Sequence, residues 1–198
     1  MSLDTEMLKK YLALLRKQQR EKQVYQDYFD GKFDILHKYP HNTSRSNIVV
    51  VVNYFKKFVQ DEVAYALGNK PSYISTEDNK EAVNILDENF SKWLRVHNQK
   101  LVLEGLKFGE SYEIKYTSGL DFRCGVLTPL TTLVVESGDI EKKVELALHV
   151  YPEESFSEKE CLDVYVKNMV YTYRLTTDTE FEFLRKNRSH FKSPPIEV

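Results

Sequence analysis

The stretch Tyr112-Glu113-Ile114-Lys115-Tyr116 marks the point at which the pattern of the sequence changes. Apolar and charged residues alternate strictly here, and a period of two is typical of a strand with one buried face. Upstream, apolar residues recur at three- and four-residue spacing, which indicates helices. Downstream, short β-branched and aromatic runs are separated by turn residues. The sequence therefore predicts an α+β fold, with long N-terminal helices packed on a mainly antiparallel β-sheet.

The upstream half predicts three helices with recognisable ends. The first follows Asp4 and carries the apolar stripe Leu8, Leu12 and Leu15, until Asp30-Gly31 stops it. The second spans about residues 54–67. Its expected N-cap is Asn53, its expected left-handed stop is Gly68, and Pro71 is expected to block its continuation. The third spans about residues 79–108, with a bend near His97-Asn98, and ends at Gly109.

These signals predict three regions along the chain. Residues 1–37 form an N-terminal helical arm, residues 38–47 a polar loop, and residues 48–198 an α+β domain. Helices occupy about 54–67 and 79–108 of that domain, a short strand covers 72–75, and the main strands begin at about residue 111. The expected strands after 112–116 are 121–127, 131–136, 146–151 and 163–175.

Composition limits the classes of function. Of the 198 residues, 41% are hydrophobic and 29% are charged, which is typical of a globular domain. The 28 Lys and Arg residues against 30 Asp and Glu give a net charge of −2, whereas a protein that grips a nucleic-acid backbone tends to be basic. The longest apolar run, 48–52, is far too short to span a membrane. We therefore expect no membrane partner and no DNA-gripping role.

Candidate reactive residues lack the spacing that chemistry needs. The histidines and the two cysteines, Cys124 and Cys161, form no metal-ligand pattern, and no Gly-rich phosphate loop occurs. The most enzyme-like feature is Glu113-Ile114-Lys115 with Glu104 and Glu110 upstream, because an acid and a lysine on one strand face could serve a magnesium-dependent nuclease. The same spacing arises on any solvated strand face. We predict no catalytic, cofactor-binding or metal-binding residues, no cofactor, and a protein that is not an enzyme.

Four stretches resemble, in the same order, those of the portal proteins of long-tailed phages. They are Tyr25–Gly31 followed by Ile35-Leu36; Asn47–Val49 and Val52–Val59 running on to Gly68–Pro71; Gly109–Tyr112; and Ser193–Val198. The resemblance covers nearly the whole chain. It implies a wing-like α+β fold and a structural subunit of the portal ring, the DNA entry and exit channel at the capsid vertex used in genome packaging and head–tail joining.

The resemblance also implies partners and a location. The full-length protein would form a homo-oligomeric ring, typically of twelve subunits, that meets terminase, capsid and scaffold proteins and head-completion proteins. Double-stranded DNA would pass through it without sequence recognition. The expected location is the portal vertex of the virion, and the host cytoplasm during assembly. The chain would cover mainly the wing and stop where the stem helix should begin, so the isolated fragment is expected to be a monomer or small oligomer.

Two other functions stay open at this stage. A stand-alone virion or prophage adaptor of α+β build would show the same absence of catalytic motifs. The magnesium-dependent nuclease is the third possibility, and it depends on the Glu113 and Lys115 pair.

Overall fold

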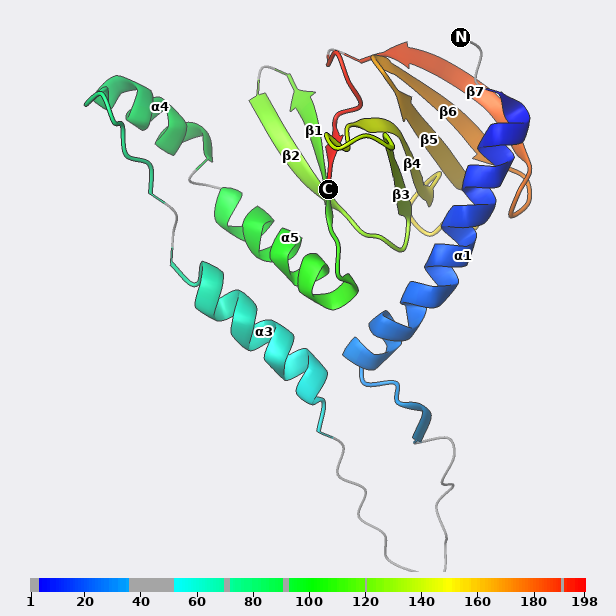
Figure 1. Ribbon diagram of the computed structural model, residues 1–198, viewed down its shortest axis with the longest axis horizontal. Helices are drawn as coiled ribbons and strands as arrows, with labels where there is room; N and C mark the ends of the chain where they lie inside the picture. Colours follow the sequence, from blue (N-terminus) through cyan, green and yellow to red (C-terminus); the bar gives the residue numbers. More distant parts are fainter. Residues whose placement is uncertain (1–3, 36–51, 70–71, 91–92, 120, 190) are drawn as a thin grey trace, which may run out of the picture. The chain divides into compact units, whose positions relative to one another are not determined.

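The computed structural model describes residues 4–35, 52–69, 72–90, 93–119, 121–189 and 191–198 (Figure 1). The chain divides into two compact units. Unit 1 comprises Met1–Glu21 and Glu110–Val198, and unit 2 comprises Lys22–Gly109. The fold is α+β with antiparallel sheets, as predicted. No helix in the described part of the chain is both long and apolar enough to cross a membrane.

Unit 1 is built on a five-stranded antiparallel sheet in which each strand pairs with its neighbour in sequence. The order is β3-β4-β5-β6-β7, and the strands are β3 (Thr132–Glu136), β4 (Val144–Pro152), β5 (Glu160–Val166), β6 (Met169–Leu175) and β7 (Phe181–Arg188). A second sheet of three strands has the order β2-β1-β8, from β2 (Asp121–Leu127), β1 (Tyr112–Ser118) and β8 (Ile196–Glu197).

The two faces of the five-stranded sheet have different coverings. On one face, Leu148 and Leu162 pack with the leucine stripe of helix α1 (Thr5–Phe29), formed by Leu8, Leu12 and Leu15. All three leucines are at most 1% exposed. On the other face, Ala147 and Tyr165 pack with Tyr112 and Ile196 of the three-stranded sheet. Side-chain alternation along each strand sends neighbouring residues to opposite cores, so the sheet is buried on both sides.

Two features of this sheet differ from the sequence prediction. The single strand expected over 163–175 is the hairpin of β5 and β6, whose turn is Lys167-Asn168. Lys167 has a φ of 52°, a conformation that hairpin turns usually give to glycine or asparagine, so Asn168 was the only turn residue in the sequence there. Strand β7 was not predicted, because its sequence shows only a weak apolar pattern. The structure explains this: seven of its eight residues are exposed.

Unit 2 begins with the last part of α1 and continues into α3 (Tyr54–Leu67). Asn53 is the N-cap of α3, as predicted: its Oδ1 accepts a hydrogen bond from the Lys56 amide at 2.9 Å. Its Nδ2 also donates to the carbonyls of Tyr28 and Phe29 at 2.9 and 3.0 Å. These carbonyls end α1 and have no partner within the helix, although that of Tyr28 also accepts from the Gly31 amide at 3.1 Å. Asn53 therefore satisfies the end of one helix and the start of the next.

The turn after α1 also follows the prediction. Gly31 has a φ of 83°, the left-handed conformation that ends a helix. A β-carbon at this position would lie 3.8 Å from the side-chain Nδ2 of Asn53. Phe29 packs edge-to-face on Phe55, with ring centroids 6.2 Å apart. The stretches around Gly31 and Asn53, which the sequence analysis singled out separately, thus form one joint within unit 2.

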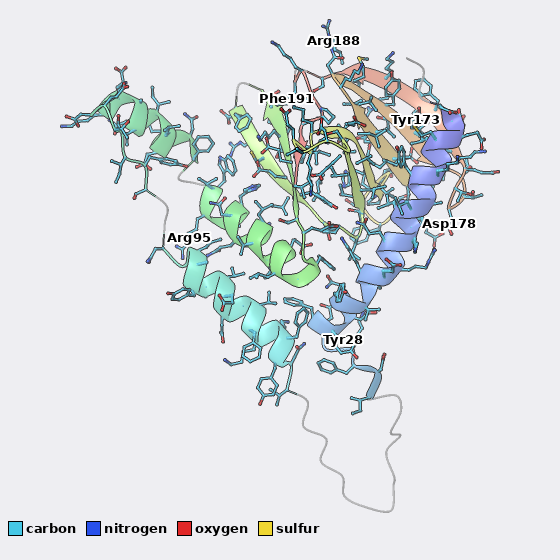
Figure 2. All side chains as sticks on the ribbon, viewed as in Figure 1. Tyr28, Arg95, Tyr173, Asp178, Arg188 and Phe191 are labelled. Carbon is cyan, nitrogen blue, oxygen red and sulfur yellow. The ribbon has the colours of Figure 1, made fainter. Side chains whose placement is uncertain are left out.

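Helix α3 ends differently from the prediction. Gly68 has φ −63° and ψ −35°, which is right-handed, so the expected left-handed stop is wrong. A β-carbon at Gly68 would instead lie 2.5 Å from the Ala64 carbonyl oxygen, which explains the need for glycine. Arg95 and Gln99 donate to the carbonyls of Gly68 and Leu67 at 2.6 and 3.1 Å, and so cap the helix from outside (Figure 2). Pro71 lies outside the described residues.

The helix expected over 79–108 is two helices, α4 (Lys80–Phe90) and α5 (Leu94–Phe108). The break lies between Phe90 and Leu94 and not at the expected His97-Asn98, which lie inside α5. The residues at 72–75 form no regular strand, and Ile74 is 88% exposed. The expected borders of arm, loop and domain fall within 36–51, outside the described residues, so that division stays a prediction.

Candidate functional site: a polar pocket between the two sheets

Unit 1 contains a pocket of about 440 Å³ between β1 and the last three strands of the five-stranded sheet. Its wall on the five-stranded sheet carries polar side chains, including Asp163, Thr172 and Arg185. The opposite wall carries Ile114 and Tyr116, and the segment after β7 adds Phe191 and Pro195. A volume of this size lies in the range of small-ligand and side-chain binding sites.

Asp163 is the centre of the polar wall. It lies on β5, and it accepts a hydrogen bond from the Thr172 hydroxyl on β6 at 2.7 Å. The hydroxyls of Tyr151 and Tyr165 also hydrogen-bond to it. Burial and the Asp163 charge together raise the pKa of Tyr151 to about 12, and they raise that of Tyr165 further. Both phenols are therefore protonated donors at neutral pH.

Arg185 lies beside this carboxylate network on β7. Strand pairing places Asp163, Thr172 and Arg185 opposite one another in one row across the sheet. The Arg185 Nε donates to the Thr172 hydroxyl at 3.4 Å, and no Asp or Glu in the described part of the chain forms an ion pair with it. The remaining guanidinium donors face a partly apolar pocket, an environment that favours an anionic group.

The remaining titratable groups on this side of the sheet are not activated for catalysis. Burial lowers the pKa of His149, and the Asp163 charge only partly opposes this, so the ring is neutral at pH 7. Burial raises the pKa of the Cys161 thiol. A nucleophile would need a lowered pKa or an adjacent base. The pocket is suited to binding and not to nucleophilic attack.

The residues considered for a nuclease have separate local partners. Lys115 pairs with Glu197 across the β1–β8 ladder, and Glu113 hydrogen-bonds the Cys124 thiol, whose pKa burial raises to about 11. Glu110 accepts from the Tyr112 hydroxyl at 2.7 Å. Glu104 lies in unit 2, where it pairs with Lys107 at 2.5 Å. Each acid is thus engaged by a different local partner.

In the part of the chain that the structure describes, no three His, Cys, Asp or Glu side chains are placed to hold a metal ion. Both cysteines are free thiols, Cys161 buried and Cys124 half-buried. Of the five histidines, His97 is buried and stacks edge-to-face on Trp93, while His149 is half-buried beside Tyr151. His37, His41 and His190 lie outside the described residues.

Sequence reasoning missed the pocket itself. Asp163 was expected in a strand, but a lone acid in a strand gives no sign of being the acceptor of three hydroxyl groups. Arg185 lay in a segment with no predicted strand. The polar wall of the pocket forms only because the pairing of β5, β6 and β7 brings Asp163 and Arg185, twenty-two positions apart, into one row.

Residues 8–198 match the sequence model of the family described as phage portal protein, SPP1 Gp6-like. The match covers both units except the first residues of α1. No curated protein matches the chain significantly.

Proposed function

Since the chain belongs to the SPP1 Gp6-like family of phage portal proteins, we propose that it forms subunit contacts within the portal ring at the capsid vertex. A structural role in the phage head follows from the family. The finer proposals are that the ring is homo-oligomeric, typically of twelve subunits, and that it serves genome packaging and head–tail joining. The full-length protein would meet terminase, capsid and scaffold proteins and head-completion proteins, and would assemble in the host cytoplasm.

The observation that carries this proposal is the match over 8–198, which includes the joint at Asn53 and the sheets of unit 1. The state of the titratable groups supports a role without catalysis. The hydroxyl groups around Asp163 serve as hydrogen-bond donors, and the pKa values of both thiols are raised. These are properties of a binding surface.

The charge of the chain supports passage of DNA without sequence recognition. A conduit must let the duplex slide, so clustered phosphate contacts would oppose its task. A net charge of −2 is compatible with weak contact only, because non-specific affinity for DNA comes from neutralised phosphates. We expect the chain to bind duplex DNA weakly in physiological salt, with a dissociation constant in the sub-millimolar range or larger. That constant should change little with salt concentration.

The test is deletion of the reading frame that encodes this chain from its phage or prophage. We expect tails and heads to be made, but no heads filled with DNA, and the gene supplied in trans should restore the titre. A normal yield of DNA-filled particles after the deletion would contradict the proposed function. If the deleted phage still packages DNA but has lost a magnesium-dependent nuclease activity, the result would instead favour the nuclease function.

A further inference from the structure

Phe156 is an aromatic side chain with nothing to cover it. It is 104% exposed and lies in the loop between β4 and β5, at a φ of 69°. A bulky residue in the left-handed region is strained, and such strain persists where the surroundings impose it. Here the Glu153 amide donates to the Lys159 carbonyl at 2.8 Å, and the Ser157 amide to the Glu154 carbonyl at 2.9 Å. The loop thus presents Phe156 in a fixed turn.

The loop around Phe156 is also acidic, and two of its charges are unused. Glu153 pairs with Arg174, and Glu160 pairs with Arg16. Glu154 and Glu158 form no ion pair with any residue that the structure describes. The loop therefore offers one aromatic ring flanked by two available carboxylates.

The pocket offers the complementary chemistry. Its apolar lining includes Phe191, Val170 and Ile114, against which an aromatic ring can pack. Arg185 borders the same space without an acidic partner in the described chain, and Arg188 borders it at the end of β7. A guanidinium can both pair with a carboxylate and stack on an aromatic ring.

A single copy cannot fill its own pocket. The loop 153–159 leaves the sheet at the Pro152–Glu160 end of the β4–β5 ladder. The pocket begins at the row of Asp163 and Arg185 and extends away from that loop, toward Arg188. Figure 2 shows the same separation, with Asp178 in the β6–β7 turn at the loop end and Arg188 and Phe191 at the other end.

We propose that the Phe156 loop of one copy inserts into the pocket of a second copy of this chain, with Glu158 or Glu154 meeting Arg185. Because each copy carries the inserting loop and the pocket at opposite ends of one sheet, the contact is head-to-tail and can close into a ring. The inference rests on the proposed function, since it supplies a contact between identical portal subunits.

The fully exposed Ile140 provides a natural comparison. It is 101% exposed in the β3–β4 turn, but it leaves the sheet at the Glu136–Val144 end, the same end as Arg188. Asp139 and Glu141 flank it, but Asp139 accepts hydrogen bonds from Ser137 and Lys142, and Glu141 pairs with Lys143. Ile140 is therefore equally exposed, but its acids already have partners and it lies at the wrong end of the sheet, so it serves as a control.

The first experiment is disulfide trapping between two different copies. In a background with Cys124→Ser and Cys161→Ala, one sample of the 198-residue chain carries Ser155→Cys, which leaves the neighbouring Phe156 ring in place, and another carries Asn187→Cys, a pocket residue. We expect a mixed-copy cross-link under mild oxidation that forms at least tenfold faster than in a mixture of Ile140→Cys with Asn187→Cys. Equal rates, or no mixed cross-link, would overturn the inference.

The second experiment measures self-association by sedimentation equilibrium. Phe156→Ser should weaken it by about 10- to 30-fold, because a buried aromatic side chain contributes about 2 kcal/mol. Arg185→Glu should weaken it by about two- to fivefold, and Glu158→Arg on the other copy should restore it. Lys186→Glu is the matched control on the same strand, where Lys186 lies over Tyr171 on the other face; it should change little.

The outcomes separate this inference from the proposed function. Oligomers that form equally well with Phe156→Ser would refute the loop-in-pocket contact and leave the portal role intact. A wild-type chain that shows neither self-association nor the cross-link would also refute the contact. A deleted phage that still packages DNA would refute the portal role even if the cross-link forms.

Discussion

Asn53 allows the joint between two helices to be tested with one side chain. Its Oδ1 caps α3 and its Nδ2 holds the last carbonyls of α1, so Asn53→Ala removes three hydrogen bonds. Loss of an N-cap costs about 1 kcal/mol, and each bond to a carbonyl contributes about 0.5–1.5 kcal/mol. Since the side chain is only half-buried, we expect a total loss of about 2–3 kcal/mol in the free energy of unfolding unit 2.

Two further variants divide this total. Asn53→Ser retains a capping oxygen but cannot reach α1 with donors, so it should lose about 1–2 kcal/mol. Asn53→Asp also keeps the cap, but it places a carboxylate against the negative end of α1, which costs about 0.3–1 kcal/mol more. The predicted order of stability is therefore wild type, serine, aspartate, alanine, with the last two close together.

The assay is urea unfolding followed by the fluorescence of Trp93, the single tryptophan, which lies in unit 2. Its indole packs on Phe90 and His97, so its emission reports the folding of that unit. If Asn53→Ala unfolds within about 0.5 kcal/mol of the wild type at an unchanged slope, the joint contributes nothing and the reasoning is refuted. If Asn53→Asp is as stable as the wild type, the cap on α3 contributes to stability and the two hydrogen bonds to α1 do not.

Three other changes have defined outcomes. Leu12→Ala should cost about 3–4 kcal/mol in chemical denaturation because Leu12 is 0% exposed, whereas Leu14→Ala, at a residue 48% exposed on the same helix, should cost under about 1 kcal/mol. Lys107→Met should lower the free energy of unfolding by about 3–5 kcal/mol, because it leaves Glu104 buried without its cation. Adding Glu104→Leu should recover most of this loss. If the double variant recovers nothing, the ion pair is not the cause. His149 has a lowered pKa in the folded chain, so the unfolded chain binds its proton more readily and stability should fall as the pH drops below about 6.5. His149→Gln should flatten the melting-temperature profile between pH 7 and 5, and an unchanged profile would assign the slope to other groups.

Predictions from the sequence succeeded where a local rule decides the structure. The alternation at Tyr112 to Tyr116, the glycine at position 31 and the cap at Asn53 each depend on neighbouring residues alone, and the structure contains all three as expected. They failed where distant residues decide. Helix α3 is closed by Arg95 and Gln99 of α5, which donate to its last carbonyls, and not by a left-handed Gly68.

The candidate site was beyond sequence reasoning for the same reason. Asp163 and Arg185 stand twenty-two positions apart and are brought into one row, on either side of Thr172, by two strand pairings, one of which involves a strand with a weak apolar pattern. The turn at Lys167 carries no glycine, so the hairpin that aligns them was hidden as well.

The interrupted layout of unit 1 has a consequence for synthesis of the chain. Helix α1 leaves the ribosome before the sheet does, because the strands that bury Leu8, Leu12 and Leu15 are encoded only after the whole of unit 2. During that interval the three leucines have no partner, while the neighbouring strands of the sheet, once made, can pair locally. Nascent chains arrested near residue 109 should therefore expose apolar surface and bind chaperones. Chains long enough to include the last strands of the sheet should no longer bind them.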